Sequence, residues 1–128
     1  MASFDEVDLK VRLGALPDLA RVEFAAACAA RMIRPWQEAR RTLGLADSER
    51  LPEAVASLRQ FVRGGPAGDW SGLAGELASG IPDENEMTTA SHAVLDDALA
   101  ATAYALRTAA TFDPQEAAWA AQASLRGD

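Results

Sequence analysis

The sequence has very few of the side chains that most often bind metals or act as nucleophiles. Among 128 residues there is one cysteine, Cys28, and one histidine, His92. A lone cysteine can form neither an internal disulfide nor a cysteine-based zinc site, and a lone histidine cannot form a paired-histidine site. We therefore expect Cys28 to be an inert core residue and His92 to be a surface or structural residue. We also expect no metal or other cofactor.

Long apolar segments are absent as well. No stretch without an acidic or basic side chain is longer than nine residues, as in Ala98–Leu106 and Ala117–Leu125. A membrane-spanning helix needs about 20 apolar residues. Residues 1–6 lack the basic region and the following apolar region that open a secretory signal. These absences predict a cytoplasmic protein that does not enter a membrane.

Recognisable catalytic motifs are also missing. The glycine-rich turn Gly64–Gly68 lacks the G-x-x-x-x-G-K order of a phosphate-binding loop, and Gly68–Gly72 only approximates a G-x-S-x-G nucleophile elbow. The acidic residues do not form the E-x-x-E and E-x-x-D pairs with which all-α pyrophosphatases bind magnesium. A magnesium-dependent enzyme is therefore the least favoured of three functional hypotheses.

Alanine is abundant, with 29 residues, and no alternating run of β-branched and aromatic residues marks a strand. We predict an all-α protein that forms a single domain over residues 1–128. Its architecture is expected to be a compact antiparallel bundle of about six to seven helices, because alanine-rich faces allow close helix packing. The expected helices are 4–13, 17–33, 35–43, 48–63, 70–79, 88–110 and a last helix that Asp113-Pro114 opens.

Apolar side chains at helical spacing predict which helix faces are buried. The faces expected at the two ends of the chain are Phe4, Val7 and Val11 in the first helix and Ala117, Ala121 and Leu125 in the last. Arg31, at the end of the second helix, could pair with Asp97 in the long helix.

Charge is distributed unevenly along the chain. The net charge is −7, but residues 1–64 carry ten basic and nine acidic side chains, whereas residues 65–128 carry two basic and ten acidic ones. Such a surface repels phosphate groups and attracts basic partners. We therefore expect no binding to nucleic acid or to anionic membranes.

Several short motifs occur in an order that resembles a known family. They are Leu16-Pro17, the segment 24–32 (FAAACAARM) with Pro35 after it, Ile81-Pro82 with the acidic residues that follow, and the segment 93–98 (AVLDDA). This order resembles the YjaG-like family of small all-helical bacterial proteins of unknown function. The resemblance covers most of the chain, implies a helical bundle, and supplies no catalytic residue. Ala30 stands where that family has a glutamate.

The favoured hypothesis is a non-catalytic, immunity-type inhibitor that binds and neutralises a basic bacterial toxin through an acidic surface. The candidate partner-binding residues are Asp69, Trp70, Glu76, Asp83, Glu84, Glu86 and Asp96. The alternative is a self-associating helical scaffold of unknown cytoplasmic role, a homodimer that packs through alanine-rich faces such as Ala117–Ala121.

Overall fold

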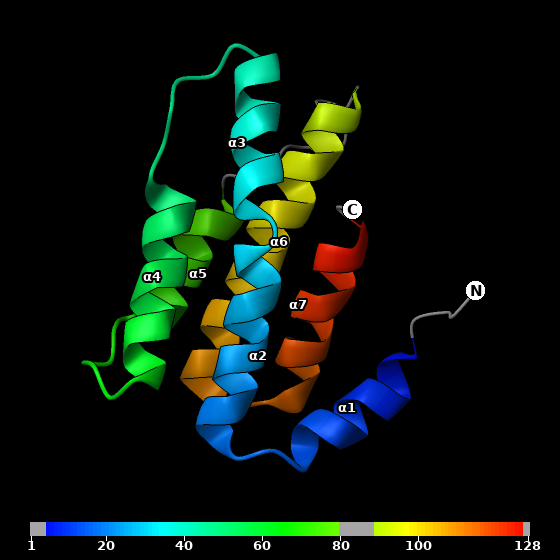
Figure 1. The fold of residues 1–128 in the computed structure, drawn as a ribbon, viewed down its shortest axis with the longest axis vertical. Helices are drawn as coiled ribbons and strands as arrows, with labels where there is room; N and C mark the ends of the chain where they lie inside the picture. Colours follow the sequence, from blue (N-terminus) through cyan, green and yellow to red (C-terminus); the bar gives the residue numbers. More distant parts are fainter. Residues whose placement is uncertain (1–4, 80–88, 127–128) are drawn as a thin grey trace.

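The computed structural model describes residues 5–79 and 89–126, and these residues form seven α-helices and no β-strand (Figure 1). The helices are α1 (Glu6–Gly14), α2 (Asp18–Ala30), α3 (Ile33–Thr42), α4 (Arg50–Val62), α5 (Trp70–Ala78), α6 (Ala90–Thr111) and α7 (Pro114–Arg126). The predicted all-α antiparallel bundle is confirmed, and each predicted helix corresponds to one of these seven.

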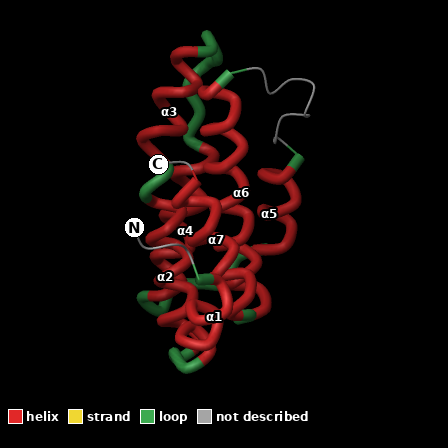
Figure 2. Tube along the Cα trace, turned by 90° about the vertical axis from the view of Figure 1, so that its right-hand side faces the viewer, coloured by secondary structure: helices red, strands yellow, loops and turns green. Residues whose placement is uncertain are grey.

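The longest helix, α6, lies at the centre of the bundle. Helices α2, α3, α4, α5 and α7 all pack against it, and α7 also packs against α2. Helix α1 packs on α7 and lies across the lower end of the bundle (Figure 2). In Figure 1, α1 lies on one side of the molecule, and α4 and α5 lie on the opposite side.

Small side chains allow α6 and α7 to approach their neighbours closely. Ala98, Ala101 and Ala105 of α6 are fully buried, and so are Ala117 and Ala120 of α7. Alanine loses no side-chain entropy when it is buried in a helix, and it keeps the distance between helix axes short. The high alanine content therefore favours helix formation and also allows the helices to pack closely.

Side-chain caps explain several helix starts. The Asp5 carboxylate accepts a hydrogen bond from Asp8 N, and the Thr89 hydroxyl accepts one from His92 N. Helix α4, which was expected over residues 48–63, has a different start. It begins at Arg50 after Glu49, and no side chain caps it, although Ser48 Oγ accepts from Arg50 N at 3.3 Å.

The predicted break before Pro35 lies slightly earlier in the structure. Helix α2 ends at Ala30, and α3 already begins at Ile33, so that Pro35 lies in the first turn of α3. Proline is tolerated there because the amide groups of a first turn have no partner within the helix.

Two of the expected apolar faces are wrong in part. Val7 and Val11 are 74% and 69% exposed, while Leu13 is buried and Leu9 packs against the core. Residues two apart on a helix lie about 200° apart, so only one of the two pairs can face α7. In α7, Leu125 is 47% exposed because the buried stripe passes through Ala121 and Ser124.

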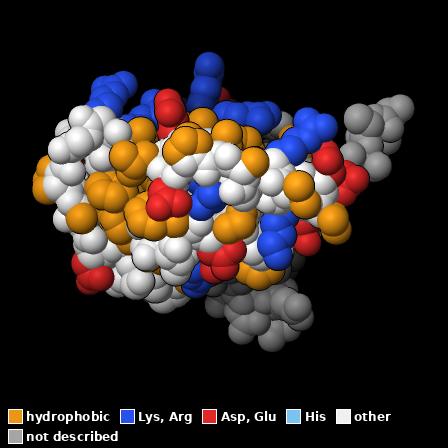
Figure 3. Space-filling model, turned by 90° about the horizontal axis from the view of Figure 1, so that it is seen from below, with side chains coloured by type: hydrophobic (Ala, Val, Ile, Leu, Met, Phe, Trp, Pro, Cys, Tyr) orange, Lys and Arg blue, Asp and Glu red, His pale blue; other side chains and the backbone are white. Residues whose placement is uncertain are grey.

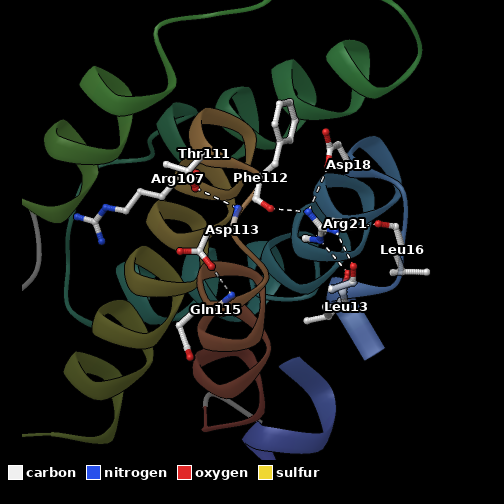
Figure 4. A network of polar contacts seen from close by, with 10 residues as sticks. Leu13, Leu16, Asp18, Arg21, Arg107, Thr111, Phe112, Asp113 and Gln115 are labelled. Atoms are coloured by element: carbon white, nitrogen blue, oxygen red, sulfur yellow. Dashed lines mark hydrogen bonds and ion pairs between the residues drawn. The ribbon is translucent and has the colours of Figure 1, made fainter. Parts of the chain in front are cut away.

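A buried arginine joins the chain segments at the lower end of the bundle (Figure 4). Arg21 of α2 is only 7% exposed. Its guanidinium donates to the carbonyl oxygens of Leu13 at 2.8 Å and Leu16 at 2.7 Å, and also to that of Phe112. Further bonds go to Gly14 O and to the Asp18 carboxylate, each at 3.3 Å. All five guanidinium donors are thereby used.

Candidate functional site

The candidate site is a groove between α4 and α5, which both lie against α6. Its volume is about 270 Å³. The residues that line it are Arg50, Glu53, Ala54 and Ser57 of α4 and Leu73, Glu76 and Leu77 of α5. We call this feature the α4–α5 groove.

The sequence of each helix explains why the groove has an apolar floor and a charged rim. Helix α4 buries Leu51, Val55 and Leu58 at helical spacing, which leaves Glu53 beside the buried stripe. Helix α5 buries Leu77 in the same way, with Glu76 next to it and exposed. Carboxylates from two helices therefore line one apolar groove.

An aromatic contact joins the two helices beyond the groove. The ring centroids of Phe61 and Trp70 are 5.4 Å apart, and the rings are tilted by 56°. Phe61 lies in the last turn of α4, and Trp70 lies in the first turn of α5. The contact therefore lies at the end where these two antiparallel helices are connected (Figure 1). The groove lies toward the other ends of the helices, at the start of α4 and the end of α5.

The arrangement suits a long basic side chain of a partner. Ala54 and Leu77 are each 6% exposed and form a floor for an aliphatic stem. Glu53 and Glu76 can accept hydrogen bonds from an ammonium or guanidinium group. Arg50 also lines the groove, so the carboxylates outnumber the basic side chain by two to one.

The structure does not bring all the predicted partner-binding residues together. Glu76 lines the α4–α5 groove. Asp69 is exposed at the opposite end of α5, where its carboxylate caps the helix by accepting from Gly72 N at 3.2 Å. Asp96 lies half-buried on α6. Asp83, Glu84 and Glu86 lie outside the described residues.

Trp70 needs a correction, because it was expected on the binding surface. It is only 5% exposed and packs against Phe61. Its Nε1 is buried and has no hydrogen-bond partner among the described residues. Its ring belongs to the core, and a partner cannot reach it without moving α5.

Glu53 is the groove residue that sequence reasoning missed. It lies in residues 1–64, where basic and acidic side chains nearly balance, so the net charge of that half did not point to an acidic surface. Its position two residues after the buried Leu51 and one before Ala54 is the signal that could have placed it at the edge of the α4 stripe.

A second groove, between α2 and α4, has the opposite charge balance. Its volume is about 320 Å³, and it is lined by Glu23, Ala27, Arg59, Val62 and Arg63. Helix α4 therefore presents Arg59 and Arg63 to one groove, and Glu53 together with Arg50 to the other. The arginine-lined groove offers a matched control for tests of the α4–α5 groove.

The expected partner of Asp97 is also corrected. Asp97 Oδ1 lies 3.4 Å from Nε of Arg126, at the end of α7, rather than pairing with Arg31. Burial raises the pKa of the Asp97 carboxyl, Arg126 opposes this shift, and Asp96 adds to it. The desolvation of Asp97 thus outweighs its attraction to Arg126.

The other titratable candidates have structural positions. Cys28 is buried as expected, and burial raises the pKa of its thiol, which disfavours the reactive thiolate. His92 lies in the first turn of α6, with Nδ1 2.8 Å from the Thr89 hydroxyl. Within residues 5–79 and 89–126, no group of three or more His, Cys, Asp or Glu residues could hold a metal ion.

The alanine-rich face that was expected to mediate dimerisation is occupied by the bundle itself. Ala117 is fully buried and Ala121 is 6% exposed, because α7 packs against α1, α2 and α6.

Among the described helices, none is both long enough and apolar enough to cross a membrane.

Comparison with known proteins gives no match to a family model, to a curated protein or to a solved structure. The resemblance to the YjaG-like family therefore stays an expectation from the sequence.

Proposed function

We propose that this chain is a non-catalytic protein-binding domain, an immunity-type inhibitor that binds and neutralises a basic bacterial toxin. The observation that carries the proposal is the α4–α5 groove, in which Glu53 and Glu76 border a floor formed by Ala54, Leu73 and Leu77. An arginine or lysine of the partner inserts there, with its stem on the apolar floor and its charge at the carboxylates.

The net charge supports the same proposal. A charge of −7 attracts a basic partner over longer distances, which raises the rate of encounter. The groove then supplies the short-range contact, because buried, charge-assisted hydrogen bonds contribute more than exposed ones. Binding should therefore weaken as salt concentration rises.

The test compares three tagged baits in lysate of the source bacterium. They are the native chain, the double variant Glu53→Gln/Glu76→Gln, and the control Arg59→Gln/Arg63→Gln in the α2–α4 groove. Both double variants change exposed side chains and leave the buried core unchanged. Arg63 is the C-cap residue of α4, but its capping hydrogen bonds come from its backbone N–H, which glutamine keeps. Captured proteins are eluted with a salt gradient and identified by mass spectrometry.

We expect the native chain and the arginine variant to retain one basic protein, which the glutamine variant at the α4–α5 groove releases at lower salt. That protein is then expressed alone and together with the native chain. Growth arrest in the first case and growth in the second support the proposal. Equal capture by all three baits contradicts the site, and a captured protein that is harmless alone contradicts the function.

A further inference from the structure

Helix α1 carries apolar side chains on two sides. Val7, Leu9, Val11 and Leu13 alternate with charged residues, so the leucines face α7 and the valines face outward. The exposed fractions of Val7 and Val11, 74% and 69%, are higher than those of the other exposed large apolar residues within the described chain. Figure 3 shows the lower end of the molecule, where apolar side chains reach the surface between side chains of both charges.

The charges beside this valine stripe are ordered along the helix. Glu6 and Asp8 lie in the first half of α1, and Lys10 and Arg12 lie in the second half. Helical geometry places Asp8 and Arg12 on one side of the stripe and Glu6 and Lys10 on the other. Asp8 and Arg12 already form an exposed pair, with 3.0 Å between Oδ2 and Nε.

We infer that the valine stripe of α1 pairs with the same stripe of a second copy of this chain, with the two helices antiparallel. Val7 then packs against the partner's Val11, and Asp8 lies opposite the partner's Arg12. On the other side of the stripe, Glu6 lies opposite the partner's Lys10. A parallel arrangement would instead place like charges opposite one another, so the charge order selects the antiparallel one.

The rest of the molecule is compatible with this pairing. Helix α1 lies on the side opposite α4 and α5, so the pairing leaves the α4–α5 groove of each copy open (Figure 1). The helix has nine residues and a length of about 13 Å, which makes a small contact and therefore a weak, concentration-dependent dimer.

Two charge variants of the full chain test the pairing. The variant Glu6→Lys/Asp8→Lys makes the charged residues of α1 basic, and Lys10→Glu/Arg12→Glu makes them acidic. Neither changes Leu9, Leu13 or the capping residue Asp5. Sedimentation velocity is recorded from micromolar to millimolar concentration, and circular dichroism checks that each variant is folded.

We expect the native chain to dimerise as its concentration rises and each charge variant to stay monomeric on its own. An equimolar mixture of the two variants should dimerise at least as strongly as the native chain. Val7→Ser/Val11→Ser should raise the dimer dissociation constant at least about tenfold, equivalent to 1.4 kcal/mol. The control Leu45→Ser, at a residue 44% exposed after α3, should leave it unchanged.

A native chain that stays monomeric at millimolar concentration overturns the inference. So does a native dimer whose two charge variants do not associate when mixed, because the interface then lies elsewhere. These outcomes are separate from the partner experiment, which changes only α4 and α5.

Discussion

Arg21 and Phe112 are 91 positions apart in the sequence, and the buried guanidinium of Arg21 donates a hydrogen bond to the Phe112 carbonyl. Phe112 ends α6 in the left-handed conformation, with φ of 57°. The same guanidinium binds the carbonyls of Leu13, in the last turn of α1, and of Leu16, in the α1–α2 connection. One side chain thus joins the end of α1 and the α1–α2 connection to the corner between α6 and α7.

Replacing Arg21 should therefore destabilise the whole bundle. We expect Arg21→Met to lower the free energy of unfolding by about 2–4 kcal/mol, because buried carbonyls lose their charged donor. Arg21→Lys should recover only part of the loss, since an ammonium has three donors in place of five. Urea denaturation measures both variants against Arg41→Met, an exposed arginine on α3. Equal stability of the native chain and Arg21→Met would contradict this role.

The cap of α5 predicts that two substitutions of Asp69 differ in effect. Asp69→Ala should cost about 1 kcal/mol, because Gly72 N loses its acceptor, whereas Asp69→Asn should cost only a few tenths. Gly72→Ala should fail to give the usual gain of replacing glycine by alanine in a helix, because its Cβ would lie 2.2 Å from Asp69 Oδ2 and displace the capping carboxylate. Thermal unfolding of the three variants checks the order. If Asp69→Asn costs as much as Asp69→Ala, the charge and not the cap stabilises α5.

Asp97 predicts a specific pH dependence. Its pKa is raised in the folded state, so the folded protein holds the proton more tightly than the unfolded chain does. The stabilisation from this proton is complete below the unfolded pKa and is lost as pH rises through the folded pKa. Asp97→Asn should therefore reduce the loss of stability between weakly acidic and neutral pH. Urea denaturation of both proteins across this range measures the difference, and parallel pH profiles would contradict the prediction.

The all-α fold was predictable because its signals are local. Alanine content, the Asp113-Pro114 start of α7 and the stripe Leu51, Val55 and Leu58 act within a few residues. The exposed face of α1 was not predictable in the same way. Leucines and valines alternate there, and only the position of α7 decides which pair becomes buried.

The site was predictable only in part, because its residues meet through tertiary contacts. Glu76 was chosen from the acidic second half of the chain, but its neighbour Glu53 belongs to the balanced first half. Trp70 was predicted on the surface together with the acidic residues of the second half of the chain, but its burial depends on a contact with Phe61, which joins α5 to α4 across the Gly64–Gly68 turn. Arg21 gave little signal, since four of its five acceptors are backbone carbonyls, which every residue has.

The burial of Trp70 predicts that its variants affect stability before they affect binding. Trp70→Ala should cost about 3–5 kcal/mol, because it leaves a cavity beside Phe61. Trp70→Phe should cost less, about 1–2 kcal/mol, since it keeps a ring in the core and removes a buried Nε1–H that has no acceptor among the described residues.

Two measurements on the Trp70 variants separate a core role from a binding role. Urea denaturation gives the stability order, with Trp70→Ala least stable. The basic partner should elute from Trp70→Phe at the same salt concentration as from the native chain, because the ring of Trp70 is only 5% exposed. A Trp70→Phe variant that is stable but releases the partner early would place the indole in the interface. It would also require α5 to move when the partner binds.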